Sequence, residues 1–452
     1  MGQYYPFFKA YDVRARVPDE LDAAMAYRVG QAFAAELGAQ TVVVGRDMRL
    51  SSPELSDALI EGLTTAGSDV LDIGLCGTEE VYFGVFSQNA DGGIMVTASH
   101  NPKDYNGLKF VREQAKPISS ETGLGDIERR VYENDLTKAD TPGRRRELAQ
   151  RDDYIDFLLA QIKPENFKPL TIVANPGNGC AGLVVDKLAE RLPFDIVRVQ
   201  FEPDGELPNG IPNPLLPENR ESTSKAVLNA NADFGVAWDG DFDRCFFFDE
   251  RGEFIEGYYI VGLIAQKLLE MNPGEAIVHD PRLIWNTLAQ VEDAGGQAVE
   301  SKSGHSFMKQ VMRENDALYG GEMSAHHYFR EFSYADNGHL PWLVLAQLVS
   351  EAGKPLSTLV EERIAAFPAS GEINRRVEDA DAVMADMEAH YRETAESIEH
   401  VDGLSMNFGE WRFNLRQSNT EPVIRLNVET RGDKPLMHDK TDELLERIGG
   451  QP

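Results

Sequence analysis

The same succession of strand, polar turn and helix recurs three times along this chain. Apolar, β-branched runs end in polar turns that open helical stretches at 41–44, 170–174 and 276–278. Each unit then contains a second apolar run that leads into an unusual polar motif, at Ser99-His100, at Asp239 to Arg244 and at Gly321 to His326. Strands that alternate with helices predict α/β domains with mixed, mostly parallel sheets. Because ligands bind beyond the carboxyl ends of such strands, we expect the three motifs to line a ligand site.

The length of the chain predicts several domains. A chain of 452 residues is too long for one hydrophobic core. Loop-like stretches divide it into α/β domains at 1–150, 151–250 and 251–367 and a smaller α+β domain at 368–452. In the last of these, apolar and polar residues alternate over 411–416 and again over 424–429. That period predicts two half-buried antiparallel strands joined by a polar loop.

The composition limits the partners that the protein can have. A formal net charge of −31 argues against nucleic acid and anionic membranes as partners, because both would repel it. No apolar run has the length of a membrane span, and the first residues lack the layout of a signal peptide. Three cysteines without metal or redox spacing favour a reducing cytoplasm. The oligomeric state stays open between monomer and homodimer.

Three aspartates, Asp239, Asp241 and Asp243, alternate between two apolar runs. In an extended segment alternate side chains point to one side, so the carboxylates would form an oxygen-rich site for Mg²⁺ or Ca²⁺. The segment is shorter than an EF-hand loop, so a phosphate-bound Mg²⁺ fits better, with Arg244 available for the phosphate. The alternative is an exposed acidic turn, which is common in so acidic a chain.

Three further motifs have both a functional and an ordinary interpretation. With a cation nearby, Ser99 can carry a phosphoryl group of about −2 charge; otherwise it is a turn serine before Asn-Pro. The loop 416–422 is either a phosphate-binding loop with one guanidinium fork or a plain hairpin loop. The alternating residues Glu322, Ser324 and His326 would face one way to bind sugar hydroxyls, or they begin a helix.

One glycine-rich motif points to a different function. Gly177 to Gly182 matches G-x-G-x-x-G after a strand, and Glu202 ends the next strand, which is the dinucleotide fingerprint in outline. An NAD-dependent dehydrogenase is therefore an alternative, although nicotinamide chemistry gives no role to the aspartates or to Ser99. The competing interpretation is a tight turn that allows close packing of helix and strand.

Taken in order, four motifs resemble those of the α-D-phosphohexomutase superfamily: Thr97 to Pro102, Asp239 to Arg244, Gly321 to His326 and Arg416 to Pro422. The resemblance extends from Lys9 to about residue 438 and is greatest to the bacterial phosphomannomutase group. It implies three similar α/β/α domains and a C-terminal α+β domain around a central cleft. Ala15 departs from the usual glycine, which would cost about 1 kcal/mol if that position needs a positive φ.

What the resemblance implies can be carried over motif by motif. Ser99 would be phosphorylated, and Mg²⁺ would bind a phosphoserine oxygen together with Asp239, Asp241 and Asp243. Glu322 and Ser324 would bind sugar hydroxyls. The phosphate that does not react would be bound by Arg416, Ser418, Asn419 and Thr420. Other positions implied in the cleft are Tyr11, Arg14, His100, Lys109, Arg244, Arg282, His305 and His326. Arg14 and Arg244 would serve catalysis, and the general base stays open among His100, Lys109 and His305.

The implied activity is the reversible conversion of mannose 6-phosphate and mannose 1-phosphate. It would proceed through phosphoserine and a hexose 1,6-bisphosphate, which also serves as activator, and would supply GDP-mannose and cell-surface polysaccharide synthesis. Glucose phosphates would be further substrates. The alternatives are a phosphoglucomutase, a phosphoglucosamine mutase, a serine-dependent phosphatase and a non-catalytic sugar-phosphate binding protein.

Overall fold

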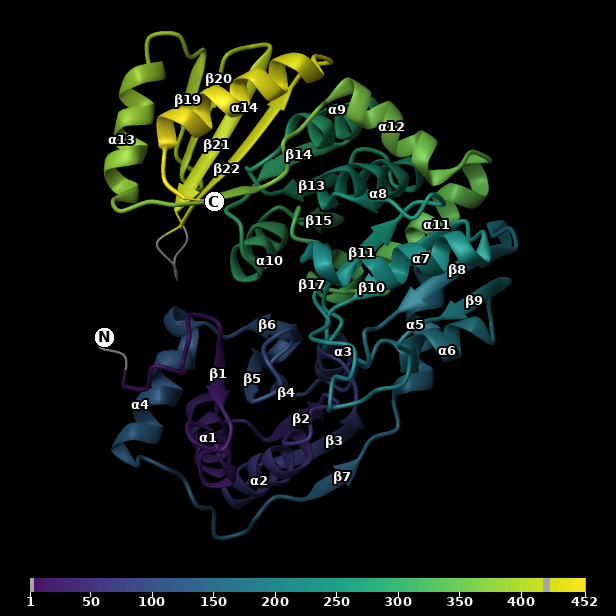
Figure 1. Ribbon diagram of the computed structural model, residues 1–452. Coiled ribbons are helices and arrows are strands. Elements are labelled where there is room, and N and C mark those ends of the chain that lie inside the picture. The colour runs from purple at the N-terminus through teal and green to yellow at the C-terminus, as the bar shows by residue number, and fades with distance from the viewer. Residues whose placement is uncertain (1–3, 418–422, 452) are drawn as a thin grey trace. The chain divides into compact units, whose positions relative to one another are not determined.

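The computed structural model describes residues 4–417 and 423–451, which form two compact units (Figure 1). Unit 1 comprises Met1–Phe254 and Tyr328–Gly353, and unit 2 comprises Ile255–His327 and Lys354–Pro452. The predicted phosphate-binding residues Ser418, Asn419 and Thr420 lie outside the described residues.

The first sheet of unit 1 has the strand order β1-β5-β4-β2-β3-β7, with β6 paired to β5. Strands β2, β3 and β4 run parallel, whereas β5 is antiparallel to both β4 and β1. The strands are β1 (Asp12–Arg16), β2 (Thr41–Arg46), β3 (Asp69–Leu75), β4 (Gly92–Val96), β5 (Tyr105–Arg112), β6 (Lys116–Pro117) and β7 (Arg145–Glu147). The helices of this region are α1 (Ala23–Leu37), α2 (Ser52–Thr65), α3 (Thr78–Ser87), α4 (Gly125–Glu133) and α5 (Arg151–Ala160). The predicted strands before Gly45 and before Ser99 are thus β2 and β4.

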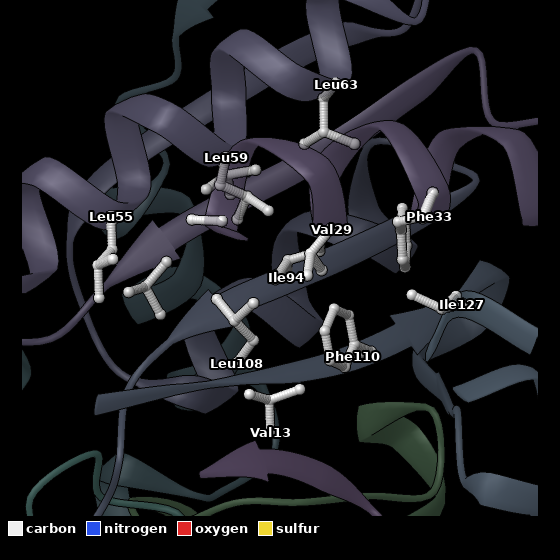
Figure 2. Packing of buried hydrophobic residues seen from close by; sticks show 14 of the residues in the cluster. Val13, Val29, Phe33, Leu55, Leu59, Leu63, Ile94, Leu108, Phe110 and Ile127 are labelled. Atoms are coloured by element: carbon white, nitrogen blue, oxygen red, sulfur yellow. The ribbon is translucent and has the colours of Figure 1, made fainter. Parts of the chain in front are cut away.

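Helices α1 and α2 cover one face of this sheet with the apolar side chains that their helical period brings together (Figure 2). Val29 and Phe33 of α1 and Leu59 of α2 are fully buried. They pack in one cluster with Ile94 of β4 and Phe110 of β5. This core packs against β4, and β4 leads into the loop of Ser99.

Ala15 lies in β1, where it pairs with Asn106 of β5. It is not among the residues with positive φ. The backbone strain considered for this alanine is therefore absent, because an extended conformation accepts any side chain.

The second sheet of unit 1 has the order β12-β11-β10-β8-β9. Its strands are β8 (Leu170–Asn175), β9 (Phe194–Arg198), β10 (Phe234–Trp238), β11 (Cys245–Phe248) and β12 (Phe254–Ile255), and its helices are α6 (Gly182–Ala189) and α7 (Glu221–Ala230). β8 is parallel to β9 and β10, and β11 is antiparallel to β10. The turn between β10 and β11 contains the three aspartates. Unit 1 also includes β17 (Ala335–Asp336), which pairs with β16 (His327–Phe329), and α11 (Leu340–Ala352).

Unit 2 contains the parallel strands of a mixed sheet, whose full order is β14-β13-β15-β16-β17, and an antiparallel sheet. β13 (Ala276–His279) lies parallel to both β14 (Gln297–Glu300) and β15 (Tyr319–Gly321). The helices here are α8 (Gly257–Met271), α9 (Trp285–Asp293), α10 (His305–Glu314) and α12 (Leu356–Ala366). The last sheet has the order β18-β22-β21-β20-β19, formed by β18 (Ile373–Arg376), β19 (Ser397–Glu399), β20 (Leu404–Asn407), β21 (Trp411–Gln417) and β22 (Val423–Thr430). Helices α13 (Ala380–Tyr391) and α14 (Lys434–Ile448) accompany it (Figure 1).

The predicted antiparallel pairing of β21 with β22 is confirmed, but the prediction that these strands are half-buried is wrong. The polar residues Arg412 and Glu429 are buried as well, and they form an ion pair at 2.8 Å. Arg412 also donates to the backbone carbonyls of Pro281 and Arg282 at 3.0 and 3.1 Å. The polar face of the sheet is therefore buried by contacts within unit 2, which an alternating sequence pattern does not reveal.

The predicted fold class is confirmed: α/β domains with mixed sheets are followed by a smaller C-terminal α+β domain. Within the described parts of the chain, no helix combines the length and the apolar character that crossing a membrane requires.

Replacing Leu59 by alanine tests the core that supports β4. Leu59 is fully buried, so Leu59→Ala is expected to lower the free energy of unfolding by about 2–5 kcal/mol through lost burial and a cavity. Urea denaturation followed by circular dichroism measures the change. Leu228→Ala is the control, because Leu228 is 55% exposed and its truncation should have almost no effect. Equal losses in the two variants would contradict this description of the core.

Candidate functional site

Ser99 lies in the loop that follows β4, and it is 2% exposed. Its hydroxyl donates to Asp239 Oδ2 at 2.8 Å and lies 3.0 Å from His100 Nδ1. Its backbone has a φ of 48°, a left-handed conformation that costs a non-glycine residue about 1–2 kcal/mol. The strained serine and the aspartate turn are thus in direct contact, as expected of motifs that follow the carboxyl ends of strands and line one ligand site.

The three aspartates converge, but not in the way that their alternation predicted. Asp239, Asp241 and Asp243 each offer a carboxylate oxygen within 4.8 Å of the others. They occupy a tight turn, in which Phe242 has a φ of 49°, and not an extended segment. Asp241 Oδ1 is buried without a hydrogen-bond partner among the described residues. An oxygen-only cluster with an unsatisfied buried carboxylate atom fits a hard divalent cation.

Two cations from this unit compensate part of the carboxylate charge. Lys109 of β5 lies 2.6 Å from Asp241 Oδ2 and 2.5 Å from Asp243 Oδ2. Arg244 lies 2.7 Å from Asp239 Oδ2. Burial raises the pKa of Asp241 to about 6, although Lys109 opposes the shift. Burial would also raise the pKa of Asp239, but Arg244 above all holds it well below its usual value.

His100 and Arg14 border Ser99 and its loop. Burial, followed by the charge of Arg244, lowers the pKa of His100 to about 4, so its imidazole is neutral near pH 7. Its Nδ1 is in hydrogen-bond contact with the Arg244 guanidinium, which can only donate, so this nitrogen accepts. Arg14 of β1 donates to Asp12 and to Asn101, each at 2.7 Å. Tyr11 directly precedes β1.

The backbone packs closely where the Ser99 loop meets the aspartate turn. A Cβ atom on Gly240 would lie 2.5 Å from the carbonyl oxygen of Ser99, and one on Gly179 would lie 2.8 Å from the carbonyl oxygen of Gly240. Gly179 belongs to the glycine-rich motif after β8. Gly179 therefore serves close packing against the aspartate turn, whereas Gly177 and Gly182 approach Pro212 and Phe201.

The motif of unit 2 that is predicted to bind sugar forms a turn, so the prediction of an extended segment is wrong here too. Ala325 has a φ of 71°, and the backbone N–H of Glu322 donates to His326 O at 3.0 Å. The turn still gathers the predicted side chains, since His326 Nδ1 lies 3.3 Å from Glu322 and 3.4 Å from Ser324 Oγ. Glu322 also accepts from the backbone N–H of Gly304 at 2.8 Å, and His305 then begins α10.

A cluster of arginines in unit 2 shares one carboxylate that sequence reasoning missed. Glu372 lies 3.1 Å from Arg416, 3.5 Å from Arg282 and 3.8 Å from Arg425. Although burial works in the opposite direction, these guanidinium groups lower the pKa of Glu372. The Nε atoms of the three arginines are buried without hydrogen-bond partners among the described residues.

Arg425 was also missed, although the sequence contains a signal for it. Arg416 and Arg425 face each other directly across the β21–β22 pair. Like charges in that position are destabilising unless something compensates them. We define Arg282, Arg416, Arg425 and Glu372 as the arginine cluster.

The predicted site residues within the described parts of the chain fall into two groups, one in each unit. Unit 1 contains Tyr11, Arg14, Ser99, His100, Lys109, Asp239, Asp241, Asp243 and Arg244. Unit 2 contains Arg282, His305, Glu322, Ser324, His326 and Arg416.

Comparison with known proteins agrees with this fold. Successive regions match the descriptions "Phosphoglucomutase/phosphomannomutase, alpha/beta/alpha domain I" at 6–138, domain II at 152–252, domain III at 256–367 and the C-terminal domain at 372–447. A relative described as "Phosphohexose mutases" in Xanthomonas campestris pv. campestris is 57% identical, covering 98% of this chain and 99% of its own length. A phosphomannomutase of Salmonella montevideo is 56% identical, covering 98% of both chains.

A solved structure has the same fold. A phosphoglucomutase/phosphomannomutase family protein of Burkholderia thailandensis matches with a TM-score of 0.87 and 31% identity, covering 98% of both chains. Fold and matches together define a mutase of the isomerase class, which transfers a phosphoryl group. The chain belongs to the phosphoglucomutase/phosphomannomutase family. The dehydrogenase alternative is thereby left without support.

Removing the shared carboxylate of the arginine cluster tests its charge balance. Glu372→Gln leaves the guanidinium groups without their common partner, so the Tm should fall by about 2–4 °C for each kcal/mol lost. Inorganic phosphate should raise the Tm of this variant more than that of the unchanged protein, because an anion replaces the lost charge. Thermal scans with and without phosphate measure both effects. Glu362→Gln is the control, since Glu362 forms an exposed ion pair with Lys354. An equal response to phosphate in all three proteins would contradict the prediction.

Proposed function

We propose that this enzyme interconverts mannose 6-phosphate and mannose 1-phosphate through phospho-Ser99. The observation that carries the proposal is the contact of Ser99 Oγ with Asp239 Oδ2 at 2.8 Å, beside Asp241 and Asp243. A phosphoryl acceptor next to a carboxylate cluster that fits a divalent cation is what phosphoryl transfer requires. The relatives named phosphomannomutase support mannose phosphates as substrates. We propose glucose phosphates as further substrates.

Mg²⁺ is the cation that we propose for Asp239, Asp241, Asp243 and a phosphoryl oxygen on Ser99. The oxygen-only donor set and the unsatisfied Asp241 Oδ1 support it. When bound, Mg²⁺ stabilises negative charge on the transferring phosphoryl group. Arg244 and Lys109, which already contact these carboxylates, would neutralise further charge of the phosphoryl group.

The reaction consists of two transfers at one oxygen atom. In the first, the Oγ–P bond of phospho-Ser99 breaks as a P–O bond forms to the free hydroxyl of the hexose phosphate, whose proton passes to a base. In the second, Ser99 Oγ attacks the other phosphoryl group of the hexose 1,6-bisphosphate, and the sugar oxygen recovers a proton. The Oγ proton already lies in a hydrogen bond to Asp239 Oδ2 at 2.8 Å, whereas the Nδ1 lone pair of His100 accepts from the Arg244 guanidinium. Asp239 would therefore take the proton as the second transfer begins.

The roles in sugar-phosphate binding that we propose within unit 2 fall on two groups of residues. Glu322 and Ser324 would bind hydroxyls, with His326 beside them. The arginine cluster would bind the phosphate that does not react. Its buried Nε atoms, which have no hydrogen-bond partner within the described parts of the chain, support this. The bisphosphate must be able to bind in either of two orientations. This phosphate site would therefore recognise the charge and shape of a phosphate group and not the anomeric carbon.

The proposal also covers the cellular compartment, the activator, the use of the product and the domain boundaries. We propose a cytoplasmic enzyme that uses hexose 1,6-bisphosphate as activator and supplies GDP-mannose synthesis, with the four domain boundaries given above. The three cysteines are buried and unpaired, which supports a reducing compartment.

Ser99→Ala tests the phosphoryl acceptor. This variant should lose turnover and should carry no phosphoryl group, because no other atom can replace Oγ. Intact-mass measurement of the purified protein and assays with mannose and glucose 1-phosphates check both points. Ser68→Ala is the matched control, since Ser68 is a buried serine whose hydroxyl donates to Ala39 O in the core. Substantial mutase activity in Ser99→Ala would overturn the proposal, and release of inorganic phosphate without isomerisation would indicate a phosphatase.

Asp241→Asn tests the metal site. MgCl₂ at a hundredfold excess over its Kd should stabilise the unchanged protein by about 2.7 kcal/mol, seen as a rise in Tm. The variant should lose most of this rise, because the amide removes one negative charge from the cluster. Asp249→Asn serves as control, since Asp249 is buried in a turn with Arg251. The same Mg²⁺ response in Asp241→Asn would exclude the aspartate turn as the metal site.

A further inference from the structure

Arg49 is the buried cation of unit 1 to which neither the sequence motifs nor the proposed reaction gives a role. It lies in the turn between β2 and α2, and its side chain is 1% exposed. The nearest carboxylate is that of Asp47, with 3.4 Å between Arg49 Nε and Asp47 Oδ2. A guanidinium removed from water needs hydrogen-bond acceptors. Its acceptors therefore show what the residue does.

The guanidinium of Arg49 donates to backbone carbonyls of the Ser99 loop. Nη2 donates to Ser99 O at 3.0 Å and to Asn101 O at 2.6 Å. Nη1 donates to Pro102 O at 2.7 Å and to Tyr105 O at 2.9 Å. One side chain thus binds the loop along its whole length, from the reacting serine to the first residue of β5.

The backbone of Arg49 is itself held firmly in the core of unit 1. Asp47 Oδ1 accepts from the backbone N–H of Arg49 at 2.9 Å and from Ser52 Oγ at 2.5 Å. The N–H of Asp47 donates to Val96 O, the last residue of β4, at 3.0 Å. Asn106 of β5 donates to Ser52 Oγ at 2.9 Å. The start of α2 and the ends of β4 and β5 therefore form a rigid base for the guanidinium.

The Ser99 loop needs such support because its conformation is strained. Ser99 has a positive φ, a state that persists only when the surroundings impose it. Its carbonyl oxygen is fixed by Arg49 on one side and by the close approach of Gly240 on the other. Its N–H donates to Thr97 Oγ1 at 2.9 Å. These contacts set the place of Oγ between Asp239 and His100.

We propose that Arg49 is the positioning residue of the phosphoryl-transfer loop, and the proposal rests on the proposed function of Ser99. Arg49 contacts the backbone of the loop, not the hydroxyl, so it acts through the placement of Ser99. It therefore governs the rate of phosphoryl transfer and leaves the affinity for the sugar phosphate nearly unchanged. A misplacement of the reacting atom by about 1 Å can cost about 10²-fold in rate.

Arg49→Lys tests the proposal because lysine keeps the charge and loses the planar fork that reaches several carbonyls. The experiment is single-turnover transfer from phospho-Ser99 to mannose 6-phosphate, followed by intact mass, together with steady-state kcat and KM. We expect transfer and kcat to fall by about 10²-fold, while KM changes little. Hydrogen exchange provides a second measurement. The N–H groups of Asn101 and Tyr105, which bond to Ala98 O and Pro102 O, should exchange faster, whereas those of β2 and β4 should not.

Leu59→Ala separates placement from stability. It weakens the core beneath the same sheet without touching the loop, so it should lower the stability and leave single-turnover transfer near that of the unchanged protein. Should Arg49→Lys transfer at the rate of the unchanged protein, or should its KM rise as much as kcat falls, the positioning role is wrong. Uniformly faster exchange across the unit in Arg49→Lys would assign Arg49 to fold stability instead.

The failure of the proposed function has a different signature. In that case the unchanged protein itself would transfer no phosphoryl group from Ser99. The Ser99→Ala variant would then have the same turnover as the unchanged protein. Normal transfer in the unchanged protein together with normal transfer in Arg49→Lys overturns only the role of Arg49.

Discussion

Buried negative charge at the end of β10 is the constraint on which the rest of unit 1 depends. Asp239 and Asp241 are fully buried, and uncompensated carboxylates there would cost several kcal/mol each. Part of the compensation comes from Lys109, which belongs to β5 of the other sheet and pairs with Met95 of β4. The same pairing fixes β4 and hence the Ser99 loop. The charge balance of the aspartate turn thus joins two domains at the reacting oxygen.

The elements and motif positions could be predicted because they depend on local patterns. Apolar runs at 41–44, 170–174 and 276–278 form β2, β8 and β13. Ser99 and the aspartate turn each follow the carboxyl end of a strand, β4 and β10. Ligand sites form beyond such ends, which is why a common site could be anticipated. The residue spacing alone left the three aspartates open between a metal site and an exposed acidic turn. The role of each motif residue was predicted from the resemblance to the superfamily.

Other features depended on contacts between distant segments and could not be predicted. Alternation indicated extended segments around Asp241 and Ser324, but left-handed residues, Phe242 and Ala325, turn both. Those turns persist because the surrounding packing imposes them, not because of local propensity. Glu372 carries no motif, since its partners come from three different places in the chain. The burial of Arg412 likewise arises from acceptors about 130 residues away.

Arg282, a member of the arginine cluster, also lies beside the turn of Glu322. It lies 4.0 Å from Glu322 and 3.5 Å from Glu372, and Arg412 of β21 binds its backbone carbonyl. The groups proposed for hydroxyls and for phosphate therefore belong to one frame of fixed length. Under the proposed function, this arrangement would admit a monosaccharide only if the separation of its phosphate and its ring hydroxyls matches that of the two groups of residues. The same contacts would then select for ring size whichever end of the sugar carries the bound phosphate.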